Sequence, residues 1–129
     1  EYTYFSSYST TWLEHAKLYC EYMTSRFKYN EDSLIVEIAS NDGYLLQYFN
    51  EKNIPVLGIE PTKNTAEVAI SKGIDTQINF FGTEYAKYLV SQGTQADLLL
   101  GNNVLAHVPD INDFTKGLKK LLKTSIQAI

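Results

Sequence analysis

The sequence has 129 residues and is 44% apolar, which is enough for one domain with a single hydrophobic core. A net charge of −4 without a long run of Lys or Arg argues against a nucleic-acid partner, and apolar runs of strand length are too short to cross a membrane. Cys20 is the single cysteine, so we predict no disulfide framework and no bound metal, and a cytoplasmic location.

The first predicted helix begins at Thr10 or Thr11, either of which can cap it, and ends at the break formed by residues 30–32. Its apolar residues recur at helical spacing and would share one face: Trp12, Ala16, Tyr19, Cys20, Met23 and Phe27. Residues 34–39 are apolar except for Glu37, a pattern typical of a strand buried on both sides. A turn at residues 40–43 and a helix to about Lys52 follow.

The rest of the sequence continues to alternate. We predict strands at residues 55–60, 76–78, 96–103 and 125–129, and helices at 66–71, 82–90 and from Pro109 onward, the last with Leu118, Leu121 and Leu122 inward. This order predicts an α/β fold, a doubly wound and mostly parallel sheet with helices on both faces. We expect one domain over residues 1–129, with an N-terminal arm and helix in 1–30 and a β/α core in 31–129. We also expect it to be a piece of a longer protein, truncated after about the fifth strand.

Ligands of such sheets bind at the carboxyl ends of the strands, where the strand order reverses. Three turns would meet at that edge: residues 39–43, Glu60–Pro61 and 102–109. The first does not suit a dinucleotide, because the three fingerprint glycines would fall at Ala39, Asn41 and Tyr44. Asp42 would also repel a pyrophosphate at the start of the helix. No Lys-Ser or Lys-Thr follows Gly43, so a P-loop is excluded as well.

A cationic ligand without phosphate reverses this electrostatic argument. Glu37 and Asp42 would attract the sulfonium and ammonium groups of S-adenosylmethionine, and Asn41 and Gly43 tolerate the positive φ angles of a tight turn. Glu60 would accept the ribose hydroxyls, a role that carboxylates also play in dinucleotide folds. Structural interpretations remain open: Glu37 could cap a neighbouring backbone, Asp42 could cap a helix, and Glu60 could be a solvated strand end.

Three segments carry a resemblance to a known family. EIASNDGYLLQYF, VLGIEP and LLLGNNVLAHVPDINDF resemble the first, second and fourth motifs of the class I S-adenosylmethionine-dependent methyltransferases. The opening YTYFSSYSTTWLEHA is similar to that of the sugar C-methyltransferases, which methylate C-3 of nucleotide-linked keto-deoxysugars. The resemblance covers nearly the whole chain. Those proteins add an N-terminal zinc-binding segment and a C-terminal domain that supplies residues near the reacting carbon, so this piece alone could be inactive.

The resemblance implies a Rossmann-like fold and a set of cofactor-binding residues. They are Glu37, Ala39, Ser40, Asn41 and Gly43 for the methionine part, Glu60 and Pro61 for the adenosine, Asn102 and Asn103 beneath the cofactor, and Tyr4 and Ser7 near cofactor and substrate. Ala39 departs from the usual glycine, and its methyl group would narrow the approach to the cofactor. His107 matches the histidine of the fourth motif and is the candidate catalytic residue.

The implied reaction needs a carbon nucleophile. A base would remove the proton on C-3 beside a keto group, and the resulting enolate would attack the methyl group in line. His107 has a suitable pKa range for that base, whereas His15 is expected to be structural or a lid contact. Two alternatives stay open: an O- or N-methyltransferase of small molecules in the same class, and a non-catalytic regulatory module. The expected partner is a nucleotide-sugar substrate, together with self-association through the truncated sheet edge.

Overall fold

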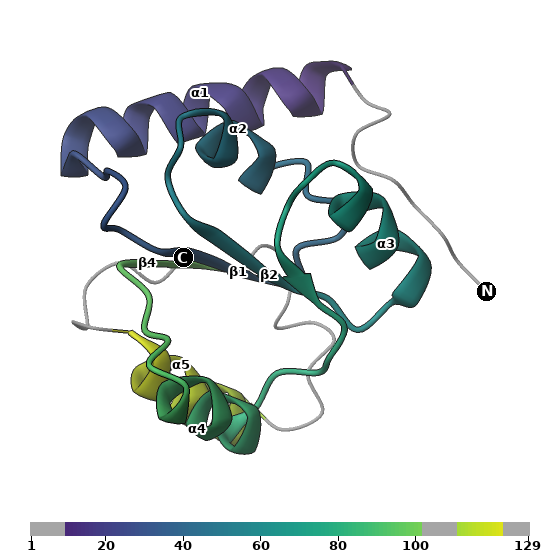
Figure 1. The fold of residues 1–129 in the computed structure, drawn as a ribbon, viewed down its shortest axis with the longest axis vertical. Helices are drawn as coiled ribbons and strands as arrows, with labels where there is room; N and C mark the ends of the chain where they lie inside the picture. The colour runs from purple at the N-terminus through teal and green to yellow at the C-terminus, as the bar shows by residue number, and fades with distance from the viewer. Residues whose placement is uncertain (1–9, 102–110, 123–129) are drawn as a thin grey trace.

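A computed structural model describes residues 10–101 and 111–122 of the chain (Figure 1). Helices and strands alternate as predicted, and the predicted strand at 125–129 lies outside the described residues. In chain order the elements are α1 (Thr10–Phe27), β1 (Ile35–Ile38), α2 (Leu46–Glu51), β2 (Val56–Ile59), α3 (Lys63–Ser71), β3 (Thr76–Gln77), α4 (Thr83–Ser91), β4 (Leu98–Leu100) and α5 (Ile111–Leu121). Among the described helices, none is long and apolar enough to cross a membrane.

The strands form one parallel sheet in the order β3-β2-β1-β4. Ile35 at the start of β1 pairs with Val56 of β2 on one side and with Leu98 of β4 on the other. The chain therefore builds outward from β1 in one direction and then crosses back to its other side. The strand order reverses between β1 and β4, the place at which such sheets have a ligand crevice beyond the carboxyl ends of the strands, and this confirms the predicted doubly wound α/β fold.

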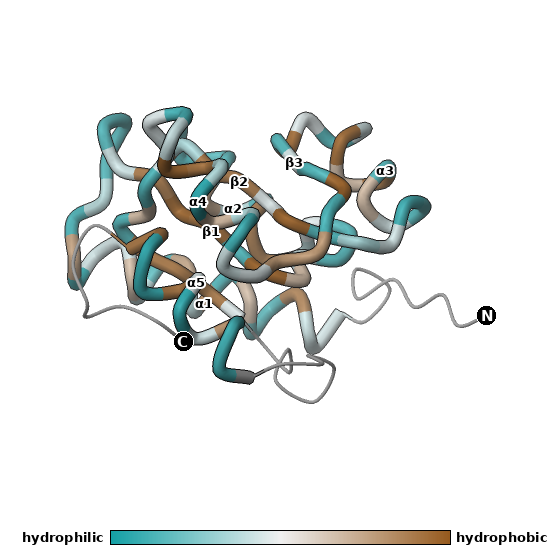
Figure 2. The backbone as a smooth tube through the Cα atoms, turned by 90° about the horizontal axis from the view of Figure 1, so that it is seen from below, coloured by the Kyte–Doolittle hydropathy of each residue, from teal (hydrophilic) through white to brown (hydrophobic). Residues whose placement is uncertain are grey.

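The sheet separates two hydrophobic cores because successive strand residues face opposite sides. One core, under α1, α2 and α3, includes Ile35 and Leu100, and the other, under α4 and α5, includes Val36 and Ile38 (Figure 1). By the same alternation Glu37 points into the first of these cores. Figure 2 shows the hydrophobic strands β1 and β2 in the interior, with hydrophilic stretches in the surrounding helices and turns.

Helix α1 covers the first core with a narrower face than the sequence pattern indicated. Ala16, Cys20 and Met23 are buried, as expected. Trp12 shares this face with Ala16 and Tyr19, as predicted, but it is 40% exposed. It lies in the first turn of α1, where its ring packs against Tyr44 with a centroid separation of 5.9 Å instead of entering the core.

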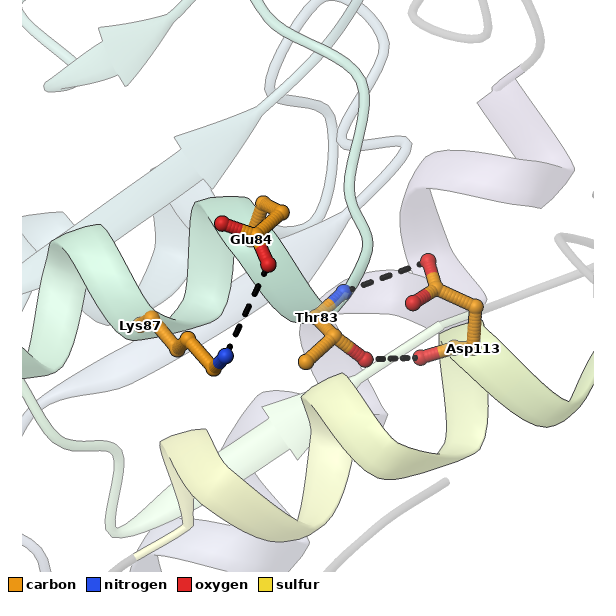
Figure 3. A network of polar contacts seen from close by, with 4 residues as sticks. All are labelled: Thr83, Glu84, Lys87 and Asp113. Atoms are coloured by element: carbon orange, nitrogen blue, oxygen red, sulfur yellow. Dashed lines mark hydrogen bonds and ion pairs between the residues drawn. The ribbon is translucent and has the colours of Figure 1, made fainter.

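Helices α4 and α5 are joined at their N-terminal ends by a polar contact (Figure 3). The backbone N–H of Thr83 donates to Asp113 Oδ2 at 3.2 Å, and the Thr83 hydroxyl donates to the Asp113 carbonyl at 3.0 Å. Hydrogen bonding from Thr83 lowers the pKa of the Asp113 carboxyl group. The Glu84–Lys87 ion pair beside them is exposed, with a separation of 3.6 Å, and contributes little to stability.

Close approach of the two helices depends on Gly117. A Cβ atom at this position would lie 2.9 Å from the Gly82 carbonyl oxygen and 2.9 Å from Phe81 Cε2. Replacing a helical glycine with alanine normally stabilises a helix by about 1 kcal/mol. We expect Gly117→Ala to destabilise this chain by roughly 1–3 kcal/mol, because the helices must move apart.

Urea unfolding of Gly117→Ala beside Lys116→Ala, an exposed neighbour on the same helix, measures this effect. An equal or higher stability for Gly117→Ala would show that α4 and α5 are not in close contact.

Candidate functional site

Part of the predicted site comes together at the carboxyl edge of the sheet. β1 leads into the turn at residues 39–43, and β2 ends next to Glu60 and Pro61. The register pairs Glu37 with Gly58 and Ile38 with Ile59, so both strands end at the same level. The remaining predicted residues, Tyr4, Ser7, Asn102, Asn103 and His107, lie outside the described residues.

The turn after β1 reverses the chain through three left-handed residues, Ala39 (φ 59°), Asn41 (φ 61°) and Gly43 (φ 82°). The conformations of Asn41 and Gly43 are those expected from their residue types. A Cβ atom at Gly43 would lie 2.5 Å from Ile74 Cδ1, so any other residue would displace the Ile74 side chain and strain the backbone. Ala39 is different, because alanine in the left-handed region costs about 1 kcal/mol. The backbone at Ala39 is therefore strained.

Glu60 fastens this turn to the next strand. Its Oε1 accepts a hydrogen bond from the Asn41 N–H at 2.8 Å, and its Oε2 accepts one from the Thr62 N–H at 2.9 Å. The side chain is 6% exposed, so Glu60 is not a solvated strand end. Each carboxylate oxygen can accept a second hydrogen bond. Glu60 thus orders two loops, and its carboxylate oxygens can still accept hydrogen bonds from a ligand. The sequence predicted only the ligand-binding role.

Glu37 is buried in the middle of β1, with 1% of its surface exposed. Neither of its carboxylate oxygens has a hydrogen-bond partner among the described residues, so they give no support to its interpretation as a backbone cap. Burial, followed by the charges of Glu60 and Asp42, raises the pKa of Glu37 well above its usual value. A buried carboxyl group without a partner is costly in a stable fold, which makes it a candidate for ligand binding.

The turn after β1 holds another buried polar group, the hydroxyl of Ser40. The Ser40 hydroxyl is fully buried and has no partner within the described part of the chain. It occupies the space above Gly58, where any Cβ would collide with Ser40 Oγ. A glycine inside a buried strand marks such a close approach, so VLGIEP carried a signal for this contact.

The electrostatic character of the site follows from its three acids, Glu37, Asp42 and Glu60, all less than 10% exposed. The ammonium group of Lys72 lies beside the turn, where it donates a hydrogen bond to the Asp42 backbone carbonyl at 3.1 Å. The site is therefore suited to a cation that also carries hydroxyl groups, and unsuited to a phosphate.

Next to the turn is a cavity of about 290 Å³ that the sequence did not reveal. α1 supplies Trp12, His15 and Tyr19, and the opposite wall is formed by Tyr44, Leu45 and Leu100. Trp12, His15 and Tyr19 lie on one face of α1, because they are separated by three and then four residues. That spacing equally indicates a helix packed on a core, which is why the cavity was missed.

Among proteins of known function, the chain is similar to methyltransferases. It is 29% identical over 121 residues to the C-methyltransferase NovU of Streptomyces niveus, covering 94% of this chain and 29% of NovU. It is 26% identical to the ubiquinone biosynthesis O-methyltransferase of Bartonella quintana, covering 73% of this chain and 38% of that protein. The chain thus spans less than half the length of these relatives. No family model matches the sequence.

Solved structures of methyltransferases share the fold. The plantazolicin methyltransferase BpumL, in a complex containing S-adenosylhomocysteine (SAH), superimposes with a TM-score of 0.63 at 18% identity, covering 88% of this chain and 43% of BpumL. The magnesium protoporphyrin IX methyltransferase of Synechocystis PCC 6803, with bound S-adenosylmethionine (SAM), gives 0.64 at 14% identity, covering 86% and 54% of the two chains. At such low identities these likenesses concern the fold alone.

The raised pKa of Glu37 makes stability depend on pH. The folded chain keeps the Glu37 proton at pH values where the unfolded chain has lost it, so stability present below pH 4.5 is lost as the pH rises. Glu37→Gln cannot ionise, and we expect it to exceed the unaltered chain in stability at pH 8 by roughly 1–3 kcal/mol. Urea unfolding at pH 5 and pH 8 measures the difference. Parallel pH dependences of the two proteins would contradict it.

The strain at Ala39 leads to a separate prediction. Ala39→Gly is expected to stabilise the chain by up to about 1 kcal/mol, because glycine adopts the left-handed conformation without steric cost. Asn53→Gly is the matched control, since Asn53 has nearly the same φ of 61° and asparagine tolerates it better. Thermal unfolding of both variants decides the matter, and a larger gain from Asn53→Gly would refute the assigned strain.

Proposed function

We propose that this chain, which is similar in sequence and fold to methyltransferases, is a class I S-adenosylmethionine-dependent methyltransferase that binds SAM at the carboxyl edge of β1 and β2 and serves methyl transfer to a small molecule. The observation that carries the proposal is Glu37, a buried carboxyl group without a hydrogen-bond partner among the described residues. Glu60, which directly follows the neighbouring strand β2, adds to the raised pKa of Glu37 and can itself accept further hydrogen bonds.

The residues present fit this cofactor. Glu37 provides an acidic partner for the cationic methionine part, and burial strengthens such an interaction because little water competes. Glu60 can accept hydrogen bonds from two hydroxyl groups of a ribose while it keeps its contacts with Asn41 and Thr62. The left-handed conformations of Ala39, Asn41 and Gly43 let the chain turn tightly at the end of β1. Pro61, the residue after Glu60, would lie beside the adenine.

When bound, the cofactor supplies a methyl group on a positively charged sulfonium. The chain's own contribution is to hold that group in a fixed place and to exclude water. Buried Leu45 and Leu100 line the space beside the turn and keep it apolar. A fixed, dry site favours attack by a weak nucleophile because the reactants are held in near-attack geometry.

The proposed acceptor is a nucleotide-linked keto-deoxysugar, methylated on carbon through an enolate. The similarity to NovU, a C-methyltransferase, over 94% of the chain supports methylation at carbon. A base must remove the C-3 proton, and His107 is the proposed residue, with Asn102, Asn103, Tyr4 and Ser7 proposed to surround cofactor and substrate. The NovU alignment covers less than a third of that protein, so further catalytic residues can come from its remaining length.

Methyl transfer to oxygen is the second candidate. The similarity to the ubiquinone biosynthesis O-methyltransferase of Bartonella quintana, at 26% identity over 95 residues, specifically favours it. An O-methyltransferase needs a base for a hydroxyl group instead of a base for a C–H bond, and the described residues suit either acceptor. The position of the methyl group in the product separates the two candidates.

Calorimetric titration with SAH tests cofactor binding, with SAM run beside it to restore the sulfonium charge. We expect saturable binding, no binding of NAD, and a loss of at least about tenfold in affinity for Glu60→Ala, since acceptors and loop order are lost together.

The control variant is Glu67→Ala, which removes an exposed acid of α3 and should leave the affinity unchanged. Circular dichroism checks that Glu60→Ala remains folded. Equal binding of NAD and SAH, or no binding of either by the unaltered chain, would refute the proposed function.

A further inference from the structure

The cavity between α1 and the sheet lies on the far side of β1 from the Glu60 clamp. Leu100, in its wall, belongs to β4, and the strand order β3-β2-β1-β4 places β4 and β2 on opposite flanks of β1. A cofactor whose ribose is held by Glu60 therefore has the cavity beyond its other end. This placement makes the cavity available to a second molecule, and it uses the proposed function as its premise.

The chemistry of the cavity wall differs from that of the acidic turn. Among the described residues that line the cavity, none is an acid, a lysine or an arginine, and three are aromatic: Trp12, Tyr19 and Tyr44. The rings of Trp12 and Tyr44 are 5.9 Å apart and inclined by 35°, so they form two adjoining flat surfaces. His15, on helix α1, adds a polar imidazole to the cavity wall. Such walls bind neutral rings through their C–H faces and edges.

The Tyr19 hydroxyl adds a second, independent sign of a ligand. It is buried and has no hydrogen-bond partner among the described residues. Burial, followed by the charges of Tyr29 and Glu37, raises its pKa to about 12, so it remains a hydrogen-bond donor at neutral pH. A buried donor without an acceptor is unfavourable, and a ligand oxygen would satisfy it.

Two other occupants fit less well. The carboxylate at the amino-acid end of the cofactor would lose its hydration in a cavity whose described lining includes no lysine or arginine. It would also lie near Glu37, whose charge acts on the wall residue Tyr19, so this occupant is costly. A long apolar chain would leave the polar groups of His15 and Tyr19 unsatisfied. The volume of about 290 Å³ is at the lower end of the range for small-molecule sites, so it suits a single ring and not a whole nucleotide sugar.

We propose that this cavity is the acceptor subsite, and that it holds a neutral, oxygenated six-membered ring against Trp12 and Tyr44, with hydrogen bonds from His15 and Tyr19. The ring is the part of the acceptor that receives the methyl group, and any charged nucleotide attached to it lies outside the cavity. Trp12 then acts as a specificity-determining residue for the acceptor and not for the cofactor.

Trp12 is the only tryptophan in the sequence, so intrinsic fluorescence reports directly on this wall. The full chain is first saturated with SAH and then titrated with dTDP-glucose, a stable nucleotide sugar, with dTDP alone as the second probe. We expect dTDP-glucose to change the Trp12 emission saturably and dTDP to leave it unchanged.

Calorimetry with variants completes the test. Trp12→Ala and His15→Ala are each expected to weaken dTDP-glucose binding at least about fivefold while changing the SAH affinity less than twofold. Both residues are exposed enough for substitution without loss of the core. Tyr22→Ala, which removes an aromatic ring from α1 outside the cavity, is the matched control and should change neither affinity.

Three results would overturn the proposal. If dTDP and dTDP-glucose change the Trp12 emission equally, the cavity does not select a sugar ring. If Trp12→Ala weakens SAH as strongly as dTDP-glucose, the cavity belongs to the cofactor. If SAH binds but dTDP-glucose does not, the assigned acceptor class is wrong. Failure of the unaltered chain to bind SAH would refute the proposed function itself. Because SAH is added before dTDP-glucose, this outcome is distinguished from failure of the acceptor subsite.

Discussion

The two hydrogen bonds accepted by Glu60 are the constraint on which the site depends. One oxygen holds the Asn41 N–H of the turn after β1, and the other holds the Thr62 N–H ahead of α3. A single carboxylate thereby fixes two loops that come from neighbouring strands. Because it is buried, these charge-assisted bonds meet little competition from water. Without them the left-handed turn at Asn41 would lose the contact that orders it, and the crevice would lose its shape.

This arrangement gathers three buried carboxyl groups, those of Glu37, Asp42 and Glu60, at the cost of stability. Glu37 has neither a counter-charge nor a hydrogen bond within the described residues, and its raised pKa expresses that cost. A cationic ligand would offset it by supplying the missing partner, so binding and stability would be coupled at this position. The same acids make the crevice unsuitable for a pyrophosphate. The buried carboxyl groups therefore favour a sulfonium compound over a pyrophosphate, although many proteins with this type of fold bind nucleotides.

The alternation of strands and helices could be predicted because period-2 and period-3.6 patterns are local properties of the sequence. The sheet order places Glu37 and Glu60 on adjacent strands, as expected from a doubly wound fold. The partners of Glu60 could not be predicted, because a strand-end carboxylate suits backbone amides and ligand hydroxyls equally well. The exposure of Trp12 could not be predicted either, since an apolar helical face continues to the end of a helix even where the core beneath it does not.

Hydrogen exchange of the Asn41 and Thr62 amides, followed by NMR with and without SAH, tests the role of Glu60 most directly. The structure predicts that both amides exchange slowly in the free chain, in contrast to an exposed loop amide such as that of Phe80, and still more slowly with SAH bound. Exchange of Asn41 and Thr62 as fast as Phe80, and unaffected by SAH, would show that Glu60 does not organise the site.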